Sequence, residues 1–372
     1  MKRYFLTAAL CAAMLLTSCG SSYGGTELTK HVKPQQIAVL DGTAEFSDAQ
    51  MQFAVSLLHQ AADSDEGNRL LSPYLAAEAW LTAAGGSAAE HPAELFGGMD
   101  AGQLNGYFAG WRASQNGLTE AQALWVAPGT DMQKDAMGLY LGLSNTRIFA
   151  AERTADMLNK WLGDATGGVM QQISVPENSE AALVSAAAFD VKWNSSYHNN
   201  EVRNALFYCA DGRQKSVPFL CKDDDTGVYI DDDAVTGLRR NCADRKYAFL
   251  ALMPKSGTVS ELLKSLTPEQ LTSYIRSGSE ITLRTTIPCA KITDTENIAE
   301  LLPDAGIGQM IQQVQVVIDR GTEESSFKLQ MNDSAAKSDV QVTFNHPFVF
   351  FVLDRQYGLP LIAGTVNELP VS

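Results

Sequence analysis

The sequence predicts an α+β protein built as one large domain. Candidate helices come mostly before candidate strands, regular βαβ alternation and internal repeats are absent, and no linker-like segment divides the body of the chain. Of the 372 residues, 45% are hydrophobic and 19% are charged. Because this leaves ample apolar surface for a buried core, the composition excludes an intrinsically disordered chain.

The N-terminal segment resembles a bacterial lipoprotein signal. Two basic residues precede an apolar run from Phe5 to Leu16, which is shorter than the roughly 20 residues needed to span a bilayer. Cys19 follows with small neighbours, and a polar Gly- and Ser-rich stretch comes next. We therefore predict a signal peptide at 1–18, a lipidated Cys19 and a flexible tether over 19–47. The protein would be exported and anchored to a bacterial membrane, on either face; the alternatives are an ordinary secretory signal or a short core helix.

The residues that follow the predicted tether show patterns typical of helices. Apolar residues recur at helical spacing over 48–62, which indicates an amphipathic helix. Ser72 and Pro73 are favoured at the cap and first turn of a helix that runs to about Ala84. This second helix is apolar on nearly every side and should be buried. A strand over 121–127 and a helix over 154–163 are expected next.

Strands dominate from about residue 181. The segment from Tyr247 to Met253 is apolar at every position, which predicts a strand buried on both faces. The other strands are expected at 183–191, 228–230, 280–287, 314–318, 348–353 and 361–366, and short helices at 259–266, 268–276 and 298–302.

The charge distribution excludes several function classes. The net charge is −15, the pI is about 4.8, and no segment clusters Lys and Arg, so we expect no nucleic-acid partner. The five His are scattered without metal-ligand spacing, and no hydrolase motif occurs, so we predict no metal, no cofactor and no catalytic residue. Two acidic runs, 223–225 and 231–233, are interpreted as solvated loops, with Ca²⁺ binding as the alternative.

Four Cys remain after the signal peptide and Cys19 are set aside: Cys209, Cys221, Cys242 and Cys289. Cys209 and Cys221 flank an Asp-Gly turn, so they are able to pair across a hairpin. Buried free thiols are the alternative interpretation.

A series of motifs runs through the chain and is clearest near the C-terminus. The run from Phe344 to Val352, followed by Gly364-Thr365-Val366, resembles the C-terminal signature of the serpin family. Segments elsewhere match family motifs in the family's order: Asn68 to Pro73, Ala121 to Val126, Leu158 to Trp161, Leu183 to Trp193, Val217 to Phe219 and Leu252 to Pro254. The resemblance implies a single serpin domain over 48–372, monomeric, with three β-sheets, eight to nine helices and an exposed reactive-centre loop at about 320–343.

The function implied by this resemblance is suicide inhibition of a serine or cysteine endopeptidase. The protease would cut the loop and form an acyl-enzyme, and the cut loop would insert into the largest sheet as a new strand. The family's spacing places the scissile bond at Ala335–Ala336, within the range 334–337. Ala at this bond suits an elastase-like or subtilisin-like protease, whereas a register that uses Lys337 suits a trypsin-like one.

The predicted loop hinge departs from the family's inhibitory pattern, which has small residues after the Gly-Thr-Glu start. Here the hinge residues are Gly321, Thr322, Glu323, Glu324, Ser325 and Ser326, followed by Phe327 and Lys328. Glu324 and Lys328 would both face inward after insertion, about 13 Å apart at roughly 3.3 Å per residue, too far to pair. Because burial of an unpaired ion costs several kcal/mol, insertion would be slowed. The alternative is therefore a non-inhibitory serpin that acts as a binding or structural surface protein.

Two further expectations concern residues around the opening sheet. The resemblance implies a buried polar cluster under the sheet, for which Ser72 and Ser185 remain candidates. The family's Lys that pairs with the loop-start acid falls near Cys289, so we expect that ion pair to be missing.

Overall fold

The computed structural model describes residues 23–85, 92–114, 117–175, 180–194, 197–320 and 338–369. The helices are α1 (Ala44–Ala61), α2 (Pro73–Ala83), α3 (Pro92–Leu95), α4 (Ala101–Ser114), α5 (Lys134–Ser144), α6 (Ala155–Ala165), α7 (Val259–Ser265) and α8 (Pro268–Arg276), with short 3₁₀ turns η2 (Asn199–Glu201) and η3 (Ile298–Glu300). The strands are β1 (Thr26–Glu27), β2 (Leu70–Leu71), β3 (Thr119–Val126), β4 (Arg147–Ala150), β5 (Ala181–Asp190), β6 (Val202–Tyr208), β7 (Gln214–Asp231), β8 (Val235–Asn241), β9 (Tyr247–Pro254), β10 (Ile281–Pro288), β11 (Ala290–Asn297), β12 (Met310–Ile318), β13 (Gln341–Thr343), β14 (Phe348–Asp354) and β15 (Pro360–Val366).

The predicted α+β class is confirmed, and most predicted elements lie within a few residues of their observed bounds. The helices α4 and α5 and the strands β4, β6, β8 and β11 were not predicted. The predicted helix at 298–302 is only the 3₁₀ turn η3. None of the helices among the described residues has the length and apolar character needed to cross a membrane.

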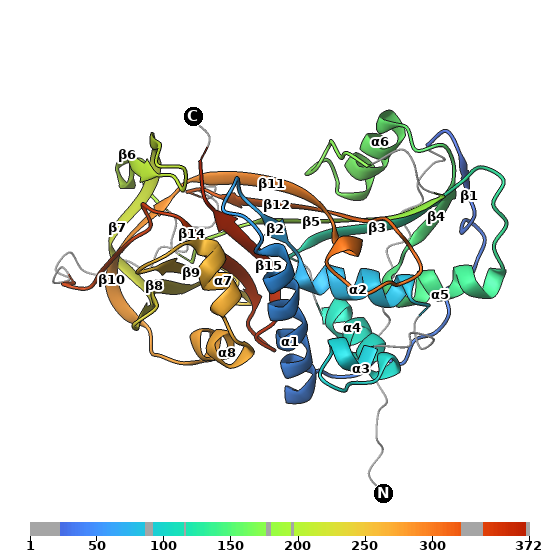
Figure 1. The fold of residues 1–372 in the computed structure, drawn as a ribbon, viewed down its shortest axis with the longest axis horizontal. Coiled ribbons are helices and arrows are strands. Elements are labelled where there is room, and N and C mark those ends of the chain that lie inside the picture. The colour runs from blue at the N-terminus through green and yellow to red at the C-terminus, as the bar shows by residue number, and fades with distance from the viewer. Residues whose placement is uncertain are drawn as a thin grey trace, which may run out of the picture.

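One sheet has six strands in the order β1-β4-β3-β5-β12-β11 and runs above α2 in Figure 1. Its two central strands, β5 and β12, are parallel and pair continuously from Met310 opposite Leu183 to Val317 opposite Asp190. Parallel neighbours need a long crossover connection, and here the chain leaves the sheet after β5 to build β6 to β10 and returns to it as β11.

The other strands form one hydrogen-bonded network of nine strands. Strand β7 is 18 residues long and contributes to two sheets. Its first part pairs with β6 and β10, and its end pairs with β8. One end of this network is thus a small sheet of β6, β7, β10 and β13, and the other is β7, β8, β9, β14, β15 and β2. Together with the six-stranded sheet, this corresponds to the three expected sheets, two of which share β7.

Helices cover both faces of the six-stranded sheet. Helix α2 is buried along almost its entire length, as its apolar sequence predicted, and Ser72 caps it by accepting a hydrogen bond from the Leu75 N–H at 3.2 Å. Helix α6 covers the opposite face, where Trp161 packs edge-on against Trp125 of β3 with ring centroids 6.2 Å apart. The sheet is therefore covered on both sides, which explains why its central strands β5 and β12 are mostly apolar.

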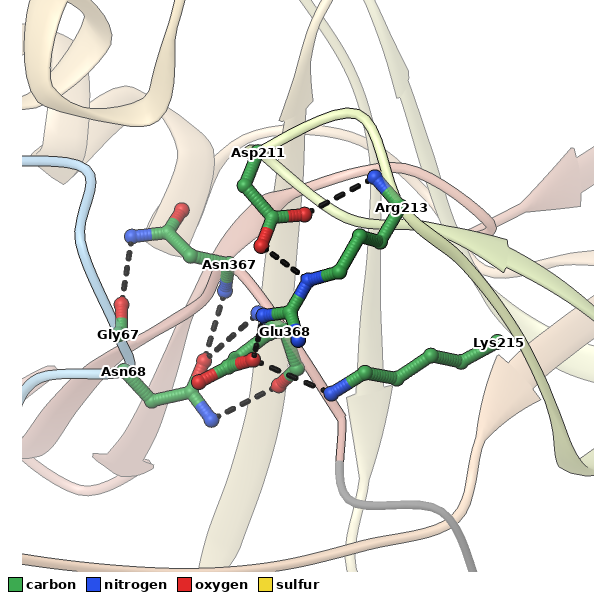
Figure 2. Close-up of polar contacts among 7 residues, drawn as sticks. All are labelled: Gly67, Asn68, Asp211, Arg213, Lys215, Asn367 and Glu368. Carbon is green, nitrogen blue, oxygen red and sulfur yellow. Dashed lines mark hydrogen bonds and ion pairs between the residues drawn. The ribbon is translucent and has the colours of Figure 1, made fainter.

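The C-terminal segment is held by a set of polar contacts that Figure 2 shows. The Asn68 amide donates to the Glu368 carbonyl at 2.8 Å and accepts from the Asn367 N–H at 2.8 Å. The Glu368 carboxylate accepts from Arg213 at 2.9 Å and from Lys215 at 3.1 Å. These contacts join the end of β15 to the start of β2 and to the β6–β7 hairpin, three segments that are distant in sequence.

Of the two interpretations of Cys209 and Cys221, the structure excludes the disulfide and shows free thiols. The β6–β7 ladder pairs Tyr208 with Gln214 and Val202 with Leu220, so the two Cys lie at opposite ends of the hairpin. At about 3.3 Å per residue, eight residues of strand separate them by about 26 Å. All four Cys of the described residues are free thiols, and Cys209 and Cys242 are buried.

Candidate functional site

The structure places only part of the predicted site. The hinge residues Gly321 to Ser326, the proposed scissile bond Ala335–Ala336 and the predicted lipidation site Cys19 lie outside the described residues. The described residues do include the strand β12 that leads into the loop, the strand β13 that follows it, and the pair Ser72 and Ser185.

The directions of β5 and β12 determine how an additional strand could pair between them. They are parallel to each other, with Gln312 paired with Ser185 and Val316 paired with Phe189. A chain that turned back after β12 would run antiparallel to β12 and therefore antiparallel to β5 as well. Such a strand would form regular ladders with both neighbours, because antiparallel pairing needs only a tight turn at one end.

A buried polar contact joins the centre of this strand pair to α2. The Gln312 side chain accepts a hydrogen bond from the Ser72 N–H at 2.7 Å and donates to the Ser72 carbonyl at 3.1 Å. The Ser72 hydroxyl donates to the Leu361 carbonyl of β15 at 2.7 Å, and the Ser185 hydroxyl donates to the Ile311 carbonyl at 3.4 Å. Ser72 and Ser185 thus lie on either side of Gln312, which the sequence analysis did not identify.

Replacement of Ser72 by Ala should lower the free energy of unfolding by about 1–2 kcal/mol, since it removes both a helix cap and a buried hydrogen bond. Urea unfolding monitored by circular dichroism measures this. The control is Thr154→Ala, which removes the cap of α6 at an exposed position, where the hydroxyl accepts only from Met157 N–H at 3.4 Å. Equal losses for the two variants would mean that the bond from Ser72 to β15 contributes nothing.

The chain leaves β12 beside an aromatic pair. The Trp193 indole N–H donates to the Asp319 carbonyl at 2.7 Å, and the Tyr197 N–H donates to the Arg320 carbonyl at 3.5 Å. Trp193 and Tyr197 pack edge to face with centroids 6.2 Å apart. The first residues after β12 are therefore held by fixed donors on the segment that follows β5.

A buried ion pair supports this aromatic pair. The Arg240 guanidinium lies 4.6 Å from the Trp193 ring centroid and 5.2 Å from that of Tyr197, and it donates to the Tyr197 hydroxyl. Arg240 and Asp225 are 3.0 Å apart with only 2% and 1% of their side chains exposed. The Thr285 hydroxyl also donates a hydrogen bond to the Asp225 carboxylate, at 2.7 Å.

Asp225 corrects the sequence interpretation of residues 223–225 as a solvated loop. The segment is part of β7, and Asp225 faces the core while Asp223 and Asp224 remain exposed. Burial raises the pKa of the Tyr197 hydroxyl to about 12, and the neighbouring Asp225 carboxylate contributes to that rise. Tyr197 is therefore a neutral donor and acceptor in this cluster at physiological pH. Among the described residues, no group of His, Cys, Asp and Glu side chains is arranged to hold a metal ion.

Cys289 lies close to the start of the loop, where the resemblance implies a Lys. Burial raises the pKa of its thiol to about 11, and the charge of Asp319 adds to that effect. A neutral thiol supplies no cation for a loop-start carboxylate.

Sequence reasoning missed Gln312, Arg240 and Asp225. A usable signal existed for Gln312, because Gln residues at 312, 313 and 315 interrupt an otherwise apolar strand. Buried polar side chains require partners, so these glutamines indicate contacts across the sheet. Gln313 and Gln315 do donate to the carbonyls of Gln172 and Val169, at 2.7 and 3.5 Å.

Comparisons with known proteins agree with this geometry. A family model described as serpin (serine protease inhibitor) matches residues 48–317. An uncharacterized serpin-like protein of Thermococcus kodakarensis is 21% identical over 282 residues, covering 66% of this chain and 65% of that protein. A probable non-inhibitory serpin-Z5 of Arabidopsis thaliana is 24% identical over 275 residues, covering 68% of this chain and 62% of that protein. These matches span somewhat less than two thirds of the relatives' own lengths.

Solved structures show the same fold. The crystal structure of tengpin, a thermophilic serpin in the native state, superposes with a TM-score of 0.83 at 21% identity, covering 93% of this chain and 100% of that chain. Native protease nexin-1 with heparin gives a TM-score of 0.75 at 14% identity, covering 87% of this chain and 99% of that chain.

Proposed function

This chain belongs to the serpin family, and from that premise we propose that it inhibits a serine or cysteine endopeptidase as a suicide substrate. The loop around 320–343 would present Ala335–Ala336 as the bond to be cut. The observation that carries the proposal is the direct parallel pairing of β5 and β12, at the point where an added antiparallel strand would gain two partners.

The connection between β12 and β13 supports the same proposal. Strand β12 ends at Ile318 in the six-stranded sheet, and β13 begins at Gln341 in the small sheet, paired with β10. Residues 319–340 therefore bridge two different sheets. Cleavage in that segment would free its N-terminal part to follow β12 back into the sheet without any change in β13.

A hairpin register can be proposed for the inserted strand. If 319–321 form the turn, Glu324 lies beside Val316 of β12, and Phe189 of β5 lies across from it on the same face. Both neighbours belong to the main hydrophobic core. Lys328 would lie beside Gln312 and Ser185, which are polar. Of the two hinge charges, Glu324 is therefore the larger obstacle to insertion.

That obstacle is the specific observation in favour of a second candidate, a non-inhibitory serpin that acts as a binding or structural surface protein. Slow insertion gives water time to hydrolyse the acyl-enzyme, so the protein would be cut without trapping the protease. The Arabidopsis relative, a probable non-inhibitory serpin, is consistent with this second candidate.

We further propose that the protein works at a membrane surface, tethered by a lipid on Cys19. The tether would keep a monomeric inhibitor close to the cell that exports it. Neither this location nor the elastase-like or subtilisin-like target follows from the family alone; both rest on the N-terminal sequence and on Ala335.

The decisive experiment is incubation with an elastase-like protease and with subtilisin, followed by a denaturing gel. An inhibitor gives a band at the summed mass of the two proteins that resists boiling. The variant Ala335→Arg should lose that band with the elastase-like enzyme and gain it with trypsin, because the residue before the cut selects the protease. Clean cleavage without a complex, in both proteins, would favour the non-inhibitory role.

A further inference from the structure

A cavity of about 750 Å³ opens between the N-terminus of α1, the C-terminal end of α8 and the strands β8, β9 and β14. The turn after β14, residues 355–358, forms one wall of it. The helices α1 and α8, whose ends line the cavity, lie on the side of the molecule away from the six-stranded sheet (Figure 1). Its volume is within the range of small-molecule sites, about 300–1,000 Å³.

Four arginines line this one cavity: Arg239, Arg245, Arg276 and Arg355. They are opposed by only two acidic lining residues, Glu280 and Asp354. In a chain whose net charge is −15, such a local excess of positive charge is contrary to the overall composition. An anion would find a favourable potential here and an unfavourable one over most of the remaining surface.

Three of these arginines donate hydrogen bonds to backbone carbonyls. Arg239 donates to the carbonyls of Tyr274 at 2.8 Å and Ile275 at the end of α8, and Arg355 donates to that of Arg245 at 2.8 Å. The guanidinium of Arg276 donates to the Tyr357 carbonyl at 3.4 Å. Within the part of the chain that the structure describes, none of the four forms an ion pair with Asp or Glu.

The two acidic residues of the cavity are engaged by other groups. The Asn241 amide donates to the Glu280 carboxylate, and the Tyr357 N–H donates to the Asp354 carboxylate at 2.8 Å. Burial lowers the pKa of Arg239, and the charge of Arg355 lowers it further, while Glu280 acts in the opposite direction. Arg239 and Arg355 therefore repel each other, and an anion bound between them would relieve that repulsion.

The remaining groups that line the cavity are suited to bind the polar, uncharged part of a ligand. The N-terminus of α1 adds its partial positive charge, since Thr43 and Ala44 line the cavity. The side chains of Ser47, Asn241 and Gln356 present a hydroxyl and two amides, which can bond to ligand hydroxyl groups. The volume exceeds what a bare inorganic anion needs.

We propose that this cavity is a binding site for a small polyhydroxylated molecule that carries a phosphate or sulfate monoester, such as a sugar phosphate. The arginines hold the anionic group by charge-assisted, bidentate hydrogen bonds, and the amide and hydroxyl side chains hold the polar body. The site is separate from the loop, so the proposal stands whether or not the protein inhibits a protease.

The test is isothermal titration calorimetry with glucose 6-phosphate, glucose 6-sulfate, inorganic phosphate and glucose as probes. We expect a phosphorylated or sulfated sugar to bind the full-length protein, more tightly than inorganic phosphate, and glucose not to bind. The double variant Arg276→Ala/Arg355→Ala, at two exposed positions, should lose at least about tenfold in affinity, because it removes two donors of charge-assisted hydrogen bonds to the anionic group.

The matched control is Arg203→Ala/Lys291→Ala, which removes the same charge from exposed positions on β6 and β11, outside the cavity. It should bind within about twofold of the parent, and circular dichroism should show both double variants folded. An equal loss in the control, or no binding of any anionic probe at millimolar concentration, would overturn the proposal. Equal affinity for inorganic phosphate and the sugar phosphate would mean that the amide and hydroxyl side chains do not bind the sugar, and it would overturn that part of the proposal.

Discussion

Cleavage of the loop at Ala335 in the Glu324→Ala variant should raise the melting temperature by roughly 15 °C. An inserted strand of about ten residues would gain about ten net hydrogen bonds, since it forms two ladders while the direct β5–β12 ladder is lost, and each is worth about 1 kcal/mol. About 10 kcal/mol corresponds to roughly 15 °C for a domain of this size. The parent protein should gain about 6 °C less, because burial of Glu324 beside Val316 and Phe189 costs several kcal/mol.

The measurement is a thermal melt before and after limited cleavage by an elastase-like protease, with the cut mapped by mass spectrometry. The matched control is Glu323→Ala, which removes the same charge from the neighbouring residue, on the opposite face of the inserted strand. It should melt like the parent after cleavage. If cleavage shifts none of the three proteins, the loop does not insert and the inhibitor proposal fails. If Glu323→Ala behaves like Glu324→Ala, the proposed register is wrong.

The Asp225→Ala variant should lose about 3–5 kcal/mol of unfolding free energy, because it leaves the buried Arg240 charge without its carboxylate partner. The loss should be accompanied by a change in the near-UV signal of Trp193, since Arg240 lies over that ring. Urea unfolding followed by far-UV circular dichroism gives the free energy, and near-UV circular dichroism reports the tryptophan. Because Trp193 donates to Asp319, the start of the loop should also become more accessible to proteases.

Two further variants separate the ion pair from a general effect of mutation in β7. Asp224→Ala removes the neighbouring exposed carboxylate and should stay within about 0.5 kcal/mol of the parent. Asp225→Ala combined with Arg240→Leu removes both buried charges and should recover much of the lost stability. A double variant less stable than Asp225→Ala alone would mean that Arg240 stabilises the fold through Trp193 and Tyr197 rather than through its ion pair.

Local sequence signals were sufficient for the elements that carry their own pattern. Ser72-Pro73 predicted the start of α2, and the unbroken apolar run after Tyr247 predicted β9, because caps and burial patterns depend on neighbouring residues. Helix α4 was missed because its sequence contains three glycines and lacks a clear apolar stripe. Its stability comes from tertiary packing, for example of Phe108 and Trp111 against Tyr74 of α2.

The sequence by itself determined the α+β class, the burial of α2, and the serpin resemblance with its predicted loop and its unusual hinge charges. Only the tertiary structure decided which polar residues meet. Asp225 and Arg240 are 15 positions apart and pair because β7 and β8 are adjacent strands, and Gln312 meets Ser72 across 240 positions. The four cavity arginines come from β8 and three separate loops or helix ends, so no segment of the chain shows a basic cluster. Charge and hydrogen bonding act through space, and for such contacts the order of residues along the chain carries little information.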